Sequence, residues 1–209
     1  MKIPSAIRLN PRRLDRVEQV LLVLGYAWLL IRIWPGQLQP ENWFSLLLLF
    51  SEGIVVFFIL IRRPTEAISL RPWDWFIAMA GTFLALAVGK GGDPLAPPAV
   101  AGSLLAFGVV VHTGAKLSLR RSFGVVAASR GVMKKGLYRL VRHPMYAGYF
   151  LSHIGYLLLA PSLWNLLVYV VVWSLLAARI FAEERILLGD LDYRSYASHV
   201  PWRVVPFVF

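Results

Sequence analysis

The chain has 209 residues, of which 58% are hydrophobic and only 16% are charged. A water-soluble domain of this length cannot bury that much apolar surface, so the composition excludes an ordinary soluble globule and indicates a membrane protein. The net charge is +11, but Lys and Arg are divided among short segments between apolar runs, as in membrane-protein loops, so we do not expect nucleic acid as a partner.

Four apolar segments occupy the first half of the chain. A helix needs about 20 residues to cross a bilayer, and each segment reaches or approaches that length. Prolines mark the gaps between them. The first segment follows an Arg-rich start without a small-residue cleavage site, so we expect no cleavable signal peptide. The predicted transmembrane helices are Val17–Trp34, Trp43–Ile61, Trp73–Val88 and Ala99–Leu117.

The second half begins with a polar stretch, Ser118–Arg142, and continues with two more apolar segments, Met145–Ala160 and Ser162–Phe181. The break between them is too short for a large loop, which predicts a transmembrane helical hairpin. The tail, Glu183–Phe209, mixes aromatic and charged residues and is expected to lie along a membrane surface. We therefore predict an all-α polytopic membrane protein with a single domain over residues 1–209, in which residues 1–117 form a transmembrane scaffold.

The distribution of positive charge predicts the orientation. If the N-terminus is cytoplasmic, all but two of the 22 Lys and Arg residues lie on the cytoplasmic side, and the exceptions are Arg32 and Lys90. Cytoplasmic loops carry the excess of Lys and Arg, so this asymmetry favours a cytoplasmic N-terminus. Both termini and the polar stretch then share the cytoplasmic face.

The run from Gly136 to Gly148, GLYRLVRHPMYAG, is the richest local pattern. Pro144 suits the first turn of a helix, where exposed backbone amides form an anion site. His143, Tyr146, Phe150 and His153 step by three, four and three and share one helix face, which predicts a wet cavity beside it. The alternative is structural, with arginines and tyrosines acting as membrane-interface anchors.

Arg179 and Glu183 form a second pattern, one helical turn apart. The simplest interpretation is an i,i+4 ion pair at a helix end. Because this helix follows the first helix of the hairpin, we expect the pair to lie near His143. An Arg and a carboxylate beside a helix start would suit a zwitterionic ligand.

Three further features carry less weight. Glu52 lies within an apolar segment, where it either pairs with another helix or lines a substrate path. His112 is expected to be structural. The stretch Gly89–Asp93 looks like a phosphate loop, but it follows no strand and is expected on the outer side, so we discount it.

Three motifs occur in order: the run ending at Gly148, then Arg179-x3-Glu183-Glu184, then Tyr193-x2-Tyr196-x3-Val200-Pro201. Together they resemble the isoprenylcysteine carboxyl methyltransferase family, which is related to bacterial phospholipid N-methyltransferases. The resemblance covers about Ser129–Phe207. It departs from the family in the spacing from Glu184 to Tyr193, which is about two residues shorter than usual.

The resemblance implies a helical membrane enzyme that takes S-adenosylmethionine from the cytosol and a lipidic acceptor from the bilayer, with residues 118–209 as the catalytic half. It makes Arg179 a substrate-site arginine. It assigns cofactor binding to Arg130, Gly131, Val132, Met133, Tyr138, His143, Pro144, Met145, Tyr146 and Glu183.

The chemistry of these residues agrees with that assignment. Helix-start amides near Met145 suit the cofactor's carboxylate, Glu183 suits its ammonium group or ribose hydroxyls, and Tyr138 or Tyr146 would face its sulfonium or adenine. A carboxylate acceptor needs no base, and Arg179 would orient it, whereas an amine or thiol would need His143 or His153 to remove a proton.

We expect an S-adenosylmethionine-dependent methyltransferase that methylates the carboxylate of a lipidic or isoprenoid acceptor, with Arg179 and His143 as catalytic residues and Arg179 and His153 as substrate contacts. One alternative is a phospholipid amine or small-thiol methyltransferase of the same fold. The other is a non-catalytic membrane protein with a degenerate methyltransferase fold, which the short spacing after Glu184 favours. No metal site is expected, and the absence of cysteine excludes thiolate metal sites.

Overall fold

The computed structural model describes residues 10–34 and 43–209. The Lys and Arg residues before position 10, which were counted on the cytoplasmic side, and the prolines between positions 34 and 43 lie outside these residues. Within them the chain is helical, and its extended segments pair at a single antiparallel bridge between Ile68 and Ala128. The predicted all-α class is therefore confirmed for this part of the chain.

The first two helices are α1, Pro11–Ile33, and α2, Trp43–Ile61. Helix α1 begins earlier than the predicted Val17 because Asn10 caps it: the Asn10 side chain accepts the N–H of Arg12 at 3.0 Å. Pro11 follows at the first helical position, where its missing N–H costs nothing. The bounds of α2 agree with the prediction.

The third predicted helix is divided in the structure. Helix α3 spans Pro72–Phe83 and passes into a 3-10 helix, η2, at Leu84–Ala87. Helix α4 spans Pro98–Leu119, close to its predicted bounds, and ends in the 3-10 turn η3, Arg120–Ser122. The third element is thus shorter and less regular than a full membrane-spanning helix.

The polar stretch is mostly irregular, apart from the end of α4, η3 and the 3-10 helix η4, Gly136–Arg139. It leads into α5, Pro144–Leu159, and α6, Leu163–Leu187. The Ser162 side chain accepts the N–H of Asn165 at 3.0 Å and so caps α6. Helix α6 continues past the predicted end at Phe181, which places Glu183 and Glu184 on a rigid helix.

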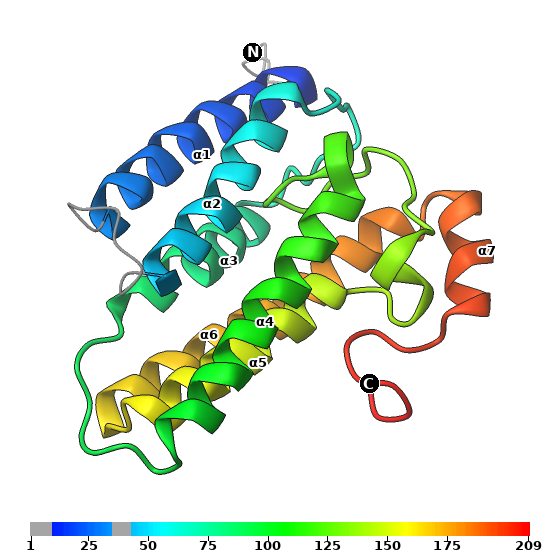
Figure 1. The fold of residues 1–209 in the computed structure, drawn as a ribbon. Coiled ribbons are helices and arrows are strands. Elements are labelled where there is room, and N and C mark those ends of the chain that lie inside the picture. Colours follow the sequence, from blue (N-terminus) through cyan, green and yellow to red (C-terminus); the bar gives the residue numbers. More distant parts are fainter. Residues whose placement is uncertain (1–9, 35–42) are drawn as a thin grey trace, which may run out of the picture.

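Figure 1 shows α4, α5 and α6 running alongside one another, with α1 and α2 paired on the other side of the molecule. Helices α5 and α6 form the predicted hairpin, but α5 packs mainly on α4, and α6 mainly on α3. Glycines permit the α4–α5 approach, since a Cβ at Gly148 would lie 2.5 Å from the backbone nitrogen of His112. Close backbone approach at small residues is typical of helix pairs in membranes.

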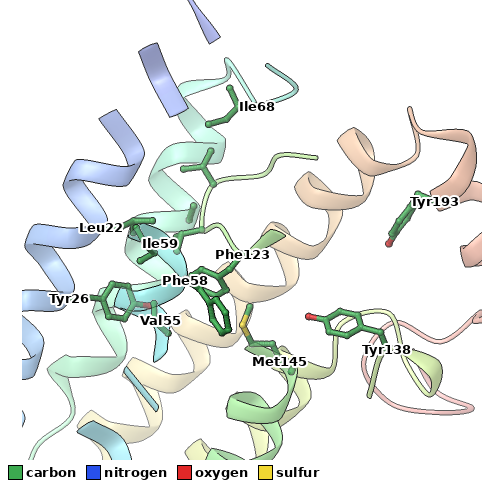
Figure 2. Packing of buried hydrophobic residues seen from close by; sticks show 14 of the residues in the cluster. Leu22, Tyr26, Val55, Phe58, Ile59, Ile68, Phe123, Tyr138, Met145 and Tyr193 are labelled. Carbon is green, nitrogen blue, oxygen red and sulfur yellow. The ribbon is translucent and has the colours of Figure 1, made fainter. Parts of the chain in front are cut away.

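A cluster of buried apolar residues connects the two groups of helices. Figure 2 shows Leu22 of α1 beside Val55 and Ile59 of α2, while Phe123 and Met145 extend the cluster toward the start of α5. Tyr138 lies beyond Met145, and Tyr193 lies at the far side of the cluster. The cluster fixes the irregular segment after α4 against the N-terminal helices.

The outer surface is strongly apolar. On α1, Val20, Leu24 and Ile31 are 58%, 63% and 76% exposed, whereas Asp15 and Glu18 of the same helix are buried. Two helical segments, Pro98–Ser122 and Leu163–Leu187, are long and apolar enough to cross a membrane.

The C-terminal tail forms a short helix, α7, Leu191–His199, followed by an irregular end. Asp190 caps this helix by accepting the N–H of Asp192 at 2.9 Å. In Figure 1, α7 and the chain end lie beside η4 and the start of α5. The tail therefore approaches the region where the polar motifs gather.

Candidate active site

The start of α5 and the last turns of α6 meet at one point, as predicted. Tyr146 donates its hydroxyl to Oε1 of Glu183 at 2.5 Å, and Arg179 donates its Nε to the same oxygen at 3.0 Å. Nδ1 of His143 lies 3.7 Å from Oε2 of Glu183. The guanidinium of Arg179 also lies over the Tyr146 ring, 5.5 Å from its centroid.

Glu184, the next residue, contacts the ring nitrogen of His143 that faces away from Glu183. Its Oε1 lies 3.2 Å from His143 Nε2 and 3.1 Å from an Arg142 nitrogen, and its Oε2 accepts from Arg203 Nε at 2.8 Å. Both ring nitrogens of His143 therefore face carboxylates, which fixes the imidazole plane. Sequence reasoning gave Glu184, Arg142 and Arg203 no role, because their partners lie on different helices or in the tail.

The predicted anion site at the start of α5 is narrower than expected. The tail takes two of the amides: His143 N donates to Arg203 O at 2.7 Å and Arg142 N to Trp202 O at 2.9 Å. Pro144 has no N–H. Within the described residues the Met145 N–H makes no hydrogen bond, so it is the amide left for a ligand.

The first cavity, of about 90 Å³, opens at this junction. Met145 and Tyr146 form its floor at the helix start. Pro144 is buried at the first turn of α5, where it sets the helix direction instead of lining the space. The other nine residues assigned to cofactor binding line the cavity: Arg130, Gly131, Val132, Met133, Tyr138, His143, Met145, Tyr146 and Glu183.

Two tyrosines of the tail motif also line this cavity, a role the sequence had not assigned. Tyr196 donates its hydroxyl to the carbonyl of Tyr138 at 2.6 Å, and the buried Tyr193 hydroxyl has no hydrogen-bond partner. Burial raises the pKa of the Tyr138 and Tyr193 phenols well above the usual value, and that of Tyr196 to about 12, so all three are neutral donors at physiological pH. The short spacing after Glu184 does not keep the tail from this cavity.

Arg130 lines the cavity but directs its charge elsewhere. Its guanidinium lies 2.5 Å from Asp15 and 2.8 Å from Glu18, both of α1, in a buried cluster that also contains Arg62. Gly131 follows with φ of 102°, a left-handed conformation that favours glycine. The Arg130 side chain thus anchors the loop, and the three residues that follow it, Gly131, Val132 and Met133, also line the cavity.

A second cavity, of about 260 Å³, is lined mainly by apolar side chains between the helices. Both residues predicted to contact the substrate, Arg179 and His153, line it. His153 Nδ1 accepts the indole N–H of Trp173 at 3.2 Å, so a neutral His153 carries its proton on Nε2. Arg179 stands between the cavities, because its partner Glu183 lines the first.

The predicted polar face of α5 divides between the two spaces. His143 and Tyr146 line the first cavity and His153 lines the second, whereas Phe150 packs on Trp173 with ring centroids 5.6 Å apart. Sequence reasoning missed Tyr149, whose ring lies 6.3 Å from both Tyr146 and His153. Its steps of three and four from those residues were a usable signal.

Glu52 and Lys116 form a buried pair across α2 and α4, with Nζ 2.9 Å from Oε1. The first alternative considered for Glu52, pairing with another helix, is therefore confirmed, and Glu52 also lines the second cavity. The charge count placed Lys116 on the cytoplasmic side, at the end of the fourth predicted helix. The structure adds that its side chain is fully buried in the last turn of α4.

The chain is similar in sequence to one known protein family. The sequence model of the isoprenylcysteine carboxyl methyltransferase family matches residues 95–189, which confirms the resemblance over α4, the polar loop, α5 and α6. The match begins earlier than the resemblance seen in the sequence and leaves out the tail after residue 189.

Three curated relatives carry related names. Protein-S-isoprenylcysteine O-methyltransferase of Schizosaccharomyces pombe is 32% identical over 106 residues, covering 46% of this chain and 44% of the relative. The A and B enzymes of that name from Arabidopsis thaliana are 31% and 30% identical over 113 and 114 residues, covering 50% and 51% of this chain and 57% of each relative. The chain thus spans about half the length of the curated relatives it matches.

A solved structure of the eukaryotic intramembrane Ras methyltransferase, isoprenylcysteine carboxyl methyltransferase, aligns over 92% of this chain and 86% of its own, with a TM-score of 0.48 and 16% identity. At that distance no residue's role transfers from it.

Proposed function

We propose that this chain is an integral membrane methyltransferase that uses S-adenosylmethionine to methylate the carboxylate of an isoprenylcysteine-type acceptor. One observation carries the proposal. Tyr146, Glu183 and Arg179 form a continuous hydrogen-bonded chain between a cavity lined by polar groups and a larger, mostly apolar cavity. A reaction between a water-soluble cofactor and a lipid needs two such spaces with a shared wall.

The surface supports a multi-pass membrane location. Apolar side chains face outward on α1 and α6, while Asp15, Glu18, Arg179 and Glu184 of these helices are buried, an arrangement unusual for a soluble domain. Less than half of each of the two spanning candidates is buried, at 39% and 44% of the most apolar window. We propose that the N-terminus and the first cavity are cytoplasmic, as the distribution of Lys and Arg favours.

The first cavity has the chemistry that S-adenosylmethionine requires. The cofactor carries a carboxylate, an ammonium group and ribose hydroxyls. The free Met145 amide would hold the carboxylate, the Glu183 carboxylate would accept from the ammonium, and the unpartnered Tyr193 hydroxyl would bond a ribose or carboxylate oxygen. When bound, the cofactor supplies an electrophilic methyl group.

Arg179 would orient the acceptor in the second cavity. Two of its contacts are long, Nη1 to Thr82 Oγ1 at 3.3 Å and Nη2 to Gly124 O at 3.4 Å, so a carboxylate could replace them with a shorter, bidentate contact. Nε stays on Glu183, which keeps the guanidinium plane aligned with the first cavity. Methyl transfer is an in-line displacement, so positioning of this kind is the main contribution of the protein.

The histidines favour a carboxylate acceptor over an amine or thiol. A carboxylate is nucleophilic without losing a proton, whereas an ammonium or thiol needs a base. The Nδ1 lone pair of His153 is occupied by Trp173, and both nitrogens of His143 face Glu183 or Glu184. Neither imidazole offers a free lone pair to an acceptor in the second cavity.

Calorimetry with the purified protein in detergent tests the cofactor assignment. We expect S-adenosylmethionine to bind the parent protein and to bind His143→Ala and Glu183→Ala at least tenfold more weakly. Absence of binding to the parent protein would refute the proposal and favour the non-catalytic alternative.

A labelled-methyl assay then identifies the acceptor. Micelles containing N-acetyl-S-farnesylcysteine, phosphatidylethanolamine or a small thiol are compared, and base-labile release of methanol reports a carboxyl ester. Base-stable label on the amine lipid or the thiol would replace the carboxylate proposal with the corresponding alternative.

A further inference from the structure

A polar group in the second cavity has no role in the chemistry proposed above. Glu52 lies in the middle of α2, a helix with no other charged residue. It lines the cavity, and its side chain is 14% exposed, whereas its partner Lys116 is fully buried. A carboxylate that served only to neutralise Lys116 would not need to reach the cavity wall.

In the Glu52–Lys116 pair, one carboxylate oxygen has no hydrogen-bond partner among the described residues. Lys116 Nζ donates to Glu52 Oε1 at 2.9 Å and to Ser51 Oγ at 3.1 Å, and it lies 5.7 Å from the Tyr149 ring centroid, so its donors are used. Ser51 Oγ also approaches Glu52 Oε1, at 3.1 Å. Within the described residues Glu52 Oε2 has no partner, so one strong acceptor remains.

His112 of α4 is the second open group. It lines the same cavity, is only 4% exposed, and its buried Nδ1 has no hydrogen-bond partner. Its ring packs on Tyr149 with centroids 4.9 Å apart, which fixes its orientation. A buried polar atom without a partner is costly unless a ligand or water satisfies it.

We infer that Glu52 and His112 form a subsite that binds a neutral hydrogen-bond donor, an N–H or O–H, carried by the acceptor. This rests on the proposed function, since it places the acceptor in the second cavity. A hydrocarbon chain leaves Glu52 Oε2 unpaired, and an anionic group is repelled by it. A cationic group would compete with Lys116, which already balances the carboxylate. None of these objections applies to a neutral donor, and the unprotonated ring nitrogen of a neutral His112 is a second acceptor for it.

The subsite predicts discrimination between two acceptors that differ by one hydrogen atom replaced with methyl. N-acetyl-S-farnesylcysteine has an amide N–H, and its N-methyl amide counterpart keeps the carbonyl, carboxylate and chain but has no donor. A hydrogen bond to a carboxylate corresponds to a preference of about tenfold or more. We expect the parent protein to bind the N–H compound at least tenfold more tightly in equilibrium titrations in detergent micelles.

Two variants test whether Glu52 and His112 cause the preference for the N–H compound. Glu52→Gln keeps the side-chain shape, and because its oxygen will face Lys116, its NH₂ group faces the cavity and cannot accept from the ligand. His112→Phe keeps the ring and removes both nitrogens. We expect each to reduce the preference to about twofold or less. Ser152→Ala is the control: Ser152 lines the same cavity, but its hydroxyl is already donated to Tyr149 O at 3.0 Å.

The affinities of the parent protein for the N–H and N-methyl compounds can be compared without any variant. This comparison tests the inference even if Glu52→Gln fails to fold. Equal affinity for the two compounds overturns it, and indicates that water alone satisfies Glu52 and His112. A preference that persists in both folded variants also overturns it, since the N–H is then recognised elsewhere. A binding preference without methyl transfer contradicts the proposed function and not the subsite, whereas equal binding with methyl transfer contradicts the subsite alone.

Discussion

Glu18 of α1 holds Arg130, with Oε2 2.8 Å from the Arg130 Nη2 nitrogen. The other oxygen of Glu18 accepts the backbone N–H groups of Val125 and Val126, each at 2.8 Å. A fully buried carboxylate on the first helix therefore ties down the loop that forms one wall of the first cavity. Since α1 lies outside residues 95–189, the part of the chain that resembles the family depends on a partner beyond it.

The Glu18→Gln variant tests this dependence. Removing one charge from a buried ion cluster leaves the others unbalanced and costs about 3 kcal/mol, which corresponds to a fall of about 10 °C in melting temperature for a chain of this length. We also expect weaker cofactor binding, because the loop loses its anchor. Glu66→Gln is the control: its pair with Arg12 is exposed, and its loss is worth about 1 kcal/mol or less. Equal melting temperatures for the two variants would contradict the account.

The Tyr146 hydroxyl orients Glu183, so Tyr146→Phe should weaken cofactor binding about tenfold, as expected for one hydrogen bond to a charged group. The control is Tyr156→Phe, which loses a hydrogen bond of 2.9 Å to Gly89 O at the other end of the same helix. Its cofactor affinity should stay within twofold of the parent. Titration calorimetry on both variants decides between a local and a general effect of losing a phenol from α5.

The elements that sequence reasoning located best are those marked by local chemistry. Pro144 and the apolar run after it predicted the start of α5 to within one residue, and the spacing of Arg179 and Glu183 placed both on one face of α6. The junction of these two elements followed from the tight hairpin turn. Periodicity, proline geometry and short connections act within a few residues, so they can be read directly.

What the sequence did not reveal depends on partners far apart in the chain. The pairing of Lys116 with Glu52 was not predicted because the two residues are 64 positions apart and lie on different helices. The resemblance assigned Arg130 to the cofactor site, but its ion pair with Asp15, 115 residues away, could not be predicted from the sequence. The backbone carbonyls of Trp202 and Arg203 accept the N–H groups of Arg142 and His143, which the helix-start pattern alone leaves without partners. Packing sets these pairings, and no local pattern records them.

Arg179→Lys separates charge from geometry at the boundary of the two cavities. Lysine keeps the positive charge but cannot span Glu183 and an acceptor carboxylate with one planar fork. We expect the KM for the carboxylate acceptor to rise about tenfold or more, while cofactor affinity changes by about threefold or less. The control is Arg185→Lys: Arg185 lies farther along α6 and pairs with Asp74 of α3. This variant should leave the acceptor KM and the cofactor affinity unchanged. A larger loss in cofactor affinity than in acceptor KM would place Arg179 in the cofactor site instead.

The α4–α5 contact leaves no room for a side chain at Gly148. A Cβ there would lie 2.5 Å from His112 N and 2.7 Å from Gly108 O, both backbone atoms that cannot rotate away. Gly148→Ala should destabilise the protein by about 3 kcal/mol through forced separation of the helices. Gly102→Ala on α4 has open space around its Cβ and should be neutral or slightly stabilising. Thermal unfolding in detergent measures both, and similar melting temperatures would show that the helices separate without cost.

Tyr196 predicts how stability depends on alkaline pH. Burial raises its pKa to about 12, from an ordinary value of 10.0. Between these values the unfolded chain loses the phenol proton and the folded chain keeps it. The contribution to stability is therefore fully present below pH 10 and is lost as the pH rises toward 12.

Tyr138 and Tyr193 shift in the same direction, so the difference between the parent and Tyr196→Phe isolates this group. The variant also loses the 2.6 Å hydrogen bond to Tyr138 O and should melt lower at pH 8. We expect the gap between the two melting temperatures to narrow as the pH rises from 10 to 12, because the variant has no phenol to ionise at that position. A gap that stays constant over this range would mean that Tyr196 ionises alike in the folded and unfolded chains, and that α7 does not bury it against the wall of the first cavity.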